Sequence, residues 1–161
     1  MKRIIATFIL LLMLYPVSLK PNMSISVVKN ISMPSEKEMR CLAENIHYEA
    51  PQEPYLGKLA VAMVTMNRVR HPDFPKTICD VVYQRNPRGC QFSWTCGARM
   101  KFNEKIYNES MKVAKAVLTD QGQLVSLENA LYFHNTKVTP NWTFARPVVR
   151  IGGHIFYEPK T

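Results

Sequence analysis

Apolar positions recur with helical spacing over the first two thirds of the chain, and they predict three long helices. The first helix begins at Ser35, which forms a capping-box pattern with Glu38, and it ends before Pro51. The second covers the run YLGKLAVAMVTMNRV, which is apolar on nearly every face and therefore predicts a helix at the centre of the domain. We expect its polar end, Asn67 and Arg68, to emerge beside a functional site.

The rest of the chain predicts a third helix and then a small β region. Residues 103–118 keep roughly helical spacing, with Asn103 as a candidate cap. The segment KTICDVVYQ is short and apolar, and its pattern does not distinguish a helix from a strand. ALYFHN is a short aromatic run, and RPVVRIGGHIFYEP predicts two strands joined by Gly152 and Gly153 in a hairpin. Helices followed by strands favour an α+β fold.

Glu49 stands at an unusual position in the first predicted helix. Counting back from Glu49 at helical spacing gives Ile46, Leu42 and Met39, so a carboxylate continues an apolar stripe. Among apolar neighbours a glutamate loses solvation, which raises its pKa and favours the protonated form that a general acid needs. The alternative is that Glu49, close to a helix end, faces water or pairs with a lysine. His47 points about 200° away around an ideal helix, so we expect it on the surface or in packing contacts.

Length and charge restrict the class of protein. The chain has 161 residues, of which 47% are hydrophobic, and this suffices for one domain with a core. The net charge of +9 favours a polyanionic partner such as nucleic acid, anionic lipid or an acidic cell-wall polymer. The basic residues are scattered from Lys58 to Arg150 without a zinc-finger or RNP-type pattern, which disfavours nucleic acid.

The N-terminus has the pattern of an export signal. A positively charged start precedes an uncharged, mostly apolar run over residues 4–19, which Pro16 interrupts. The run is shorter than the roughly 18 to 20 residues of a spanning helix, which favours a cleaved signal peptide over an N-terminal membrane anchor. No clean A-x-A cleavage site is present, so the anchor stays an alternative. We expect an exported protein, periplasmic or associated with the cell wall, with a signal or anchor at 1–20, a linker at 21–34 and a catalytic domain at 35–161.

Export changes the interpretation of the four cysteines. An even number of cysteines in a small exported domain favours disulfides, and the absence of a C-x-x-C pair or a matching His pair disfavours zinc. Three pairings are open. Cys90 and Cys96 flank a short segment and could close a local loop, which would leave Cys41 with Cys79 and tie the first helix to a later one.

Two further segments have the residue types of a carbohydrate site. CQFSWTC would present an aromatic face and polar groups for stacking on sugar rings, although isolated aromatic residues are usually core residues. LYFHNTKVTPNW combines aromatic and amide side chains that commonly line sugar grooves but are also ordinary in strands and loops. The candidate substrate-binding residues are Gln91, Phe92, Ser93, Trp94, Tyr132, His134, Asn135 and Trp142.

Five separated blocks together resemble the SleB-type cell-wall hydrolase family, which is named for the spore cortex-lytic enzyme. They are AENIHYEAPQEPYLGKLAVAMVTMNRV, the FP and CDVV segment, CQFSW, the YFHN and P-x-W segment, and the closing IGGHIFY. The resemblance covers residues 39–158 in the same order. It implies a peptidoglycan-cleaving domain with a lysozyme-like, lytic transglycosylase-like helical lobe and a small C-terminal β lobe.

The resemblance also implies roles for individual residues. In the family pattern E-A-x-x-E-P the first glutamate is the catalytic acid, which corresponds to Glu49, and we assign Glu53 to supporting structure. The implied reaction is that of a lytic transglycosylase, which forms a 1,6-anhydro sugar with one glutamate. A hydrolysing muramidase and a non-catalytic peptidoglycan-binding module are the alternatives. We expect a monomer that acts on peptidoglycan glycan strands, without nucleic acid, metal or cofactor.

Overall fold

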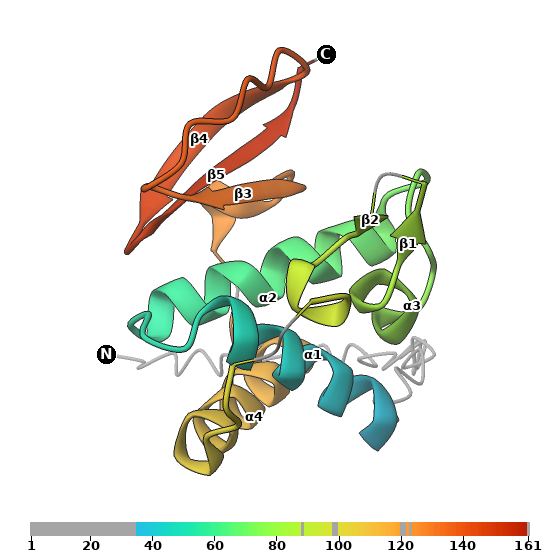
Figure 1. Cartoon of the computed structure of the whole chain (residues 1–161), viewed down its shortest axis with the longest axis vertical. Coiled ribbons are helices and arrows are strands. Elements are labelled where there is room, and N and C mark those ends of the chain that lie inside the picture. The colour runs from blue at the N-terminus through green and yellow to red at the C-terminus, as the bar shows by residue number, and fades with distance from the viewer. Residues whose placement is uncertain (1–34, 88, 98–99, 120–121, 123, 161) are drawn as a thin grey trace, which may run out of the picture. The chain divides into compact units, whose positions relative to one another are not determined.

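The computed structural model describes residues 35–160 except residues 88, 98–99, 120–121 and 123, and these described residues belong to one compact unit. Helices occupy the first part of this unit and a three-stranded sheet the last, which confirms the predicted α+β class (Figure 1). The predicted signal or anchor segment and the predicted linker lie outside the described residues. Among the helices described, none combines the length and the hydropathy that crossing a bilayer requires.

The elements follow the order that the sequence predicts. The three long helices form, the ambiguous segment KTICDVVYQ contains a short helix, and the C-terminal hairpin is present. The elements are α1 (Glu36–Glu49), α2 (Tyr55–Arg70), α3 (Ile78–Val82), β1 (Arg85–Asn86), β2 (Gly89–Cys90), η1 (Ser93–Thr95), α4 (Glu104–Leu118), η2 (Val125–Leu127), β3 (Tyr132–Asn135), β4 (Ala145–Ile151) and β5 (His154–Pro159).

The start of α1 uses only half of its predicted capping box. The Ser35 side chain accepts a hydrogen bond from the backbone N–H of Glu38 at 3.3 Å, as an N-cap should. The Glu38 carboxylate does not return to α1; it accepts the backbone N–H groups of Ile78 and Cys79 at the start of α3. This contact joins α1 to α3, and the disulfide between Cys41 and Cys79 joins them covalently.

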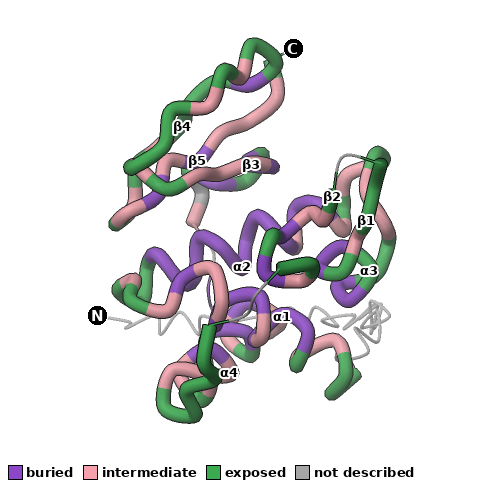
Figure 2. Tube along the Cα trace, viewed as in Figure 1, coloured by how far each residue is buried: buried purple, intermediate pink, exposed green. Residues whose placement is uncertain are grey.

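Helix α2 is the central element, as its apolar sequence predicts. Most of its residues are buried, and Figure 2 shows the buried colour along most of its length. It packs against α1, α3, α4 and the sheet region. Its polar residues find partners inside the protein: Thr65 accepts a hydrogen bond from the Asn45 side chain at 3.1 Å, and Asn67 donates to the carbonyls of Leu127 and Ala130 at 2.6 and 3.0 Å. Burial of these polar groups is tolerated because each one is paired.

The three strands near the C-terminus form an antiparallel sheet in the order β3-β5-β4. Register pairs Tyr132 with Tyr157 and Phe133 with Phe156, so side chains alternate between two faces. Phe133 and Phe156 pack in the hydrophobic core, whereas Tyr132 and Tyr157 belong to the opposite face. Gly152, at the hairpin turn between β4 and β5, has a φ of 58°, which glycine adopts readily.

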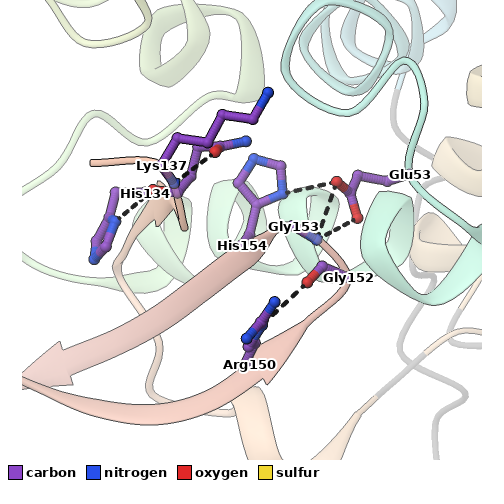
Figure 3. A network of polar contacts seen from close by, with 8 residues as sticks. Glu53, His134, Lys137, Arg150, Gly152, Gly153 and His154 are labelled. Atoms are coloured by element: carbon purple, nitrogen blue, oxygen red, sulfur yellow. Dashed lines mark hydrogen bonds and ion pairs between the residues drawn. The ribbon is translucent and has the colours of Figure 1, made fainter. Parts of the chain in front are cut away.

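Glu53 attaches this hairpin to the helices. It lies between α1 and α2, and its two carboxylate oxygens accept the backbone N–H of Gly153 at 3.2 and 3.0 Å (Figure 3). The buried His154 ring lies alongside, with Nδ1 3.7 Å from Glu53 Oε1, and burial lowers the pKa of this histidine. A Cβ atom at Gly152 would collide with Glu53 Oε2, and one at Gly153 would lie 2.7 Å from Oε1. These contacts support the structural role assigned to Glu53.

Replacing Gly152 with alanine should lower the free energy of unfolding by at least about 2 kcal/mol, because alanine is strained at positive φ and its methyl group displaces Glu53. Gly89→Ala is the matched control: Gly89 also has a positive φ of 134°, but nothing lies within 4 Å of a Cβ there. Urea denaturation of both variants measures the difference. A loss in Gly152→Ala of only about 1 kcal/mol, the cost of a left-handed backbone alone, would show that the contact with Glu53 does not matter.

Candidate active site

Glu49 is the last residue of α1 and continues the apolar stripe of that helix. Leu42 and Ile46, on the same stripe, are completely buried, whereas Glu49 is partly exposed. Burial raises the pKa of Glu49 to about 7, and the positive charge of Arg68 opposes part of that rise. A carboxyl group with this pKa is present in both protonation states at neutral pH. It can therefore donate a proton and, after donation, accept one.

Arg68 is a buried cation in the last turn of α2, and only 3% of its surface is exposed. Its Nε–H donates to the carbonyl of Leu131 at 2.8 Å. With the Gln91 amide oxygen facing the guanidinium, both terminal nitrogens of Arg68 donate to that oxygen at 3.1 and 3.2 Å. The guanidinium carbon also lies 5.4 Å from the ring centroid of Phe74 and 5.1 Å from that of Phe92. Arg68 interacts electrostatically with Glu49, but the polar end of α2 does not emerge as predicted: Asn67 and Arg68 are both buried, and Asn67 has the packing role described above.

The segment between Cys90 and Cys96 is closed by a disulfide, one of the pairings that the sequence allows. Gln91 in this loop holds Arg68 and is thus committed to a contact within the protein. Ser93 is exposed, so its hydroxyl is accessible to a ligand.

The positions of Phe92 and Trp94 do not support the prediction that they stack on sugar. Only 3% and 6% of their surfaces are exposed, and both belong to the hydrophobic core. Trp94 stacks on Tyr48 with ring centroids 4.6 Å apart, and its indole N–H donates to the Asn45 side chain at 3.1 Å. The short disulfide loop turns these rings inward, so the core interpretation of isolated aromatic residues applies. His47 is likewise a packing residue: it is 1% exposed and lies against other aromatic rings.

Three predicted residues do come together, on the face of the sheet turned away from the core. Trp142 lies with its ring centroid 6.0 Å from Tyr132 and 5.4 Å from His134. Phe144 and Tyr157, which the sequence prediction missed, complete this aromatic cluster at 5.9 and 5.2 Å from Trp142. His134 Nε2 and the Tyr157 hydroxyl are 2.8 Å apart and form a hydrogen bond. Strand alternation could have identified Tyr157, but only once its register with Tyr132 was known.

Asn135 does not join the aromatic cluster. Its side-chain oxygen accepts the backbone N–H of Lys137 at 2.9 Å, which organises the turn after β3 (Figure 3). Successive residues of a strand point to opposite faces, so Asn135 belongs to the face opposite His134. The prediction that it binds substrate together with His134 is therefore not supported by its position.

The aromatic cluster and Glu49 are related through Arg68. Tyr132, at the start of β3, and Glu49, at the end of α1, both interact electrostatically with the Arg68 charge. The Leu131 carbonyl that Arg68 holds directly precedes Tyr132 in the chain. Arg68 is thus bound directly to the residue before β3 and interacts electrostatically with the predicted acid.

A cavity of about 710 Å³ among the described residues has none of the predicted site residues in its lining. Its lining includes Met63, Met66 and Arg70, which lie on the side of α2 away from Arg68. Glycan strands bind along open surfaces as well as in closed pockets, so this cavity does not locate the site. The described residues include no group of three or more His, Cys, Asp or Glu side chains arranged to hold a metal ion.

Comparison with known proteins identifies the family. Residues 52–157, more than half of the chain, match the family model described as Cell Wall Hydrolase. The chain belongs to the cell wall hydrolase family. This confirms the resemblance seen in the sequence. The range matched by the family model begins after Glu49, so it includes Glu53 and the aromatic cluster but leaves the role of the predicted acid to be tested.

Curated relatives agree with this family. The chain is 32% identical over 127 residues to the spore cortex-lytic enzyme of Bacillus subtilis (strain 168), and 36% identical over 127 residues to that of Bacillus cereus (strain ATCC 14579). The alignments cover 77% and 76% of this chain but 38% and 44% of the relatives. The chain thus spans about two fifths of the length of these curated relatives.

Two solved structures of the family have a similar fold. The catalytic domain of the Bacillus cereus SleB protein is 29% identical, with a TM-score of 0.58, and the match covers 78% of this chain and 92% of that domain. The catalytic domain of the germination-specific lytic transglycosylase SleB from Bacillus anthracis is 26% identical, also with a TM-score of 0.58. That match covers 77% of this chain and 96% of that domain.

Glu49→Gln should make the protein more stable at neutral pH while leaving its stability at acidic pH nearly unchanged. A carboxyl group whose pKa rises from 4.5 to about 7 on folding binds more protons in the folded state, so its contribution to stability is complete below pH 4.5 and is lost as pH rises through 7. Glutamine avoids that loss. We expect a gain of up to about 3 kcal/mol at pH 8.

Urea denaturation between pH 4 and pH 8 tests this prediction. Glu104→Gln, which removes a carboxylate from an exposed position on α4, is the matched control. A difference between Glu49→Gln and the parent protein that is the same at every pH would contradict the raised pKa.

Proposed function

We propose that this chain cleaves the β-1,4 bond between N-acetylmuramic acid and N-acetylglucosamine in peptidoglycan, as a lytic transglycosylase whose catalytic acid is Glu49. Membership of the cell wall hydrolase family supports peptidoglycan as the substrate. One structural relative is described as a lytic transglycosylase, which supports the reaction type. The observation that carries the proposal is a carboxyl group at the edge of the core, Glu49, whose pKa is raised to about 7.

The proposed reaction uses Glu49 twice. Protonated Glu49 donates its proton to the glycosidic oxygen, and the bond between that oxygen and C1 of the muramic acid breaks. The resulting Glu49 carboxylate then accepts the proton of the C6 hydroxyl of the same sugar, while the C6 oxygen forms a bond to C1. The products are a 1,6-anhydromuramic end and a free N-acetylglucosamine hydroxyl, and Glu49 regains its proton. A pKa near the working pH suits a group that must act in both directions.

The surroundings of Glu49 favour this reaction over hydrolysis. Glycoside hydrolysis normally needs a second carboxylate roughly 5 to 10 Å from the acid, to act as base or nucleophile. Among the described residues, the charged group that perturbs Glu49 is the cation Arg68. Glu53, the carboxylate nearest to Glu49 along the chain, is already an acceptor for the Gly153 backbone.

The aromatic cluster is the proposed glycan-binding surface. Aromatic rings bind the apolar faces of sugars, and Phe144 is 52% exposed at the edge of the cluster. Trp142, Tyr132 and His134 are partly exposed beside it, and Ser93, exposed in the loop closed by the Cys90–Cys96 disulfide, stays a candidate for a polar contact with the glycan. The net charge of +9 would draw the protein to the carboxylates of the cell wall through a salt-sensitive attraction. We therefore propose that the protein acts at the cell wall; that it acts as a monomer stays a prediction.

Mass spectrometry of fragments released from purified peptidoglycan tests the reaction. We expect the oxidised full-length protein to release fragments with 1,6-anhydromuramic ends, and Glu49→Gln to release essentially none, because glutamine cannot donate the proton. Fragments with reducing ends would instead identify a hydrolase with a second catalytic group. Equal release by both proteins would exclude Glu49 as the acid, and no release by either folded protein would favour a binding module.

Phe144→Ala should weaken binding to insoluble peptidoglycan roughly three- to tenfold, because it removes an exposed stacking ring. Phe102→Ala is the matched control, since Phe102 is 53% exposed and contacts His47 and Tyr107 among the helices rather than the aromatic cluster. Co-sedimentation with Glu49→Gln as the background prevents digestion during the measurement. If the two substitutions weaken binding to the same extent, the aromatic cluster is not the glycan-binding surface.

A further inference from the structure

Arg68 is an unusual residue to bury. A charged side chain that is 3% exposed loses nearly all of its hydration, and proteins usually offset that cost with an opposite charge in contact. Here the direct partners of the guanidinium are neutral: the Leu131 carbonyl, the Gln91 amide and the rings of Phe74 and Phe92. Among the described residues, no carboxylate lies within ion-pair distance of it. The charge is retained in the interior without a contact ion pair, which indicates a role beyond packing.

The partners of Arg68 come from segments that are far apart in the chain. Leu131 precedes β3, which bears Tyr132 and His134 of the aromatic cluster, and Gln91 belongs to the loop closed by the Cys90–Cys96 disulfide. Arg68 itself belongs to the last turn of the central helix. Its Nε and its two terminal nitrogens therefore hold one side chain against two other segments. A guanidinium suits this position because its donors form a rigid planar fork, which a lysine lacks.

The charge of Arg68 acts on the proposed catalytic acid and on one residue of the proposed glycan-binding surface. It opposes the effect of burial on Glu49, and it interacts with Tyr132 of the aromatic cluster. Without this charge, burial alone would raise the pKa of Glu49 further. A carboxyl group with a higher pKa donates its proton less readily and exists more rarely as the carboxylate that accepts the C6 proton.

We propose that Arg68 is the positioning residue of this active site. Held by Gln91 and by the Leu131 carbonyl, its guanidinium keeps a fixed positive charge near Glu49. The same contacts fix the position of the start of β3 relative to that charge. The role of Arg68 in catalysis rests on the proposed function. The effect of its charge on the pKa of Glu49 can be measured without any catalytic turnover.

The test is a nuclear magnetic resonance titration of Glu49 in the full-length oxidised protein with ¹³C-labelled glutamate side chains, where Glu49→Gln assigns the signal. We expect a midpoint near 7 in the parent, as the pKa of about 7 implies. Arg68→Gln should raise this midpoint by about one pH unit or more, because it removes the nearby positive charge. Arg70→Gln is the matched control: it removes the same charge two residues along α2, from an exposed side chain on another side of the helix, and should leave the midpoint within about 0.2 unit.

An unchanged midpoint in folded Arg68→Gln would overturn the proposal. If that variant does not fold, Arg68→Lys and Gln91→Leu decide: each keeps the positive charge but removes contacts that hold it in place, so each should raise the midpoint. Equal midpoints in these two variants and the parent would overturn the proposal as well.

Rates of fragment release then separate this inference from the proposed function. With both correct, the upper pH at which release is half-maximal rises in Arg68→Gln together with the Glu49 midpoint, and release at a pH where Glu49 is protonated in both proteins falls by about three- to tenfold, because the acid is weaker. A shifted midpoint in a protein whose parent releases no fragments would sustain the electrostatic role of Arg68 and reject the proposed function alone.

Discussion

The burial of α2 on nearly every side is the constraint on which the rest of the structure depends. An apolar helix at the centre of a small domain must be covered, and α1, α3, α4 and the sheet region all pack against it. Burial also forces the polar residues of α2 to find partners inside the protein. Asn67 and Arg68 do so by binding the carbonyls of Leu127, Ala130 and Leu131, and this positions the segment that leads into β3.

The same desolvation that stabilises the core shapes the candidate site. Glu49 stands where the apolar stripe of α1 reaches the edge of the core, so its carboxylate is poorly solvated and its pKa rises. Arg68, held at the end of α2, limits that rise. The acid–base character of the site thus follows from the burial of Glu49 and the charge of Arg68, rather than from any unusual residue type.

A second glutamate, Glu53, has different surroundings from Glu49 and a different proposed role. Glu53 is only four residues from Glu49 in the sequence, yet its carboxylate receives the Gly153 N–H and fixes the hairpin of the sheet. The glycines at this turn leave room for it, because a Cβ atom at either position would approach the carboxylate too closely. Glu53 accepts hydrogen bonds from the backbone, whereas the Glu49 carboxylate is poorly solvated and therefore holds its proton more tightly. This difference supports their separate roles.

The sequence by itself determined the helices, the α+β class and the candidate acid, because each depends on residues close together in the chain: the Ser35 cap, the apolar run of α2, the Gly-Gly hairpin and the stripe that includes Glu49. It also determined the family, through five blocks whose order along the chain can be read without a structure. Only the tertiary structure decided which polar and aromatic side chains can face a ligand. It buried Phe92 and Trp94, committed Gln91 to Arg68, and brought Phe144 and Tyr157 to Trp142. Burial and cross-strand register arise from contacts between distant segments, and no local pattern of residues encodes them.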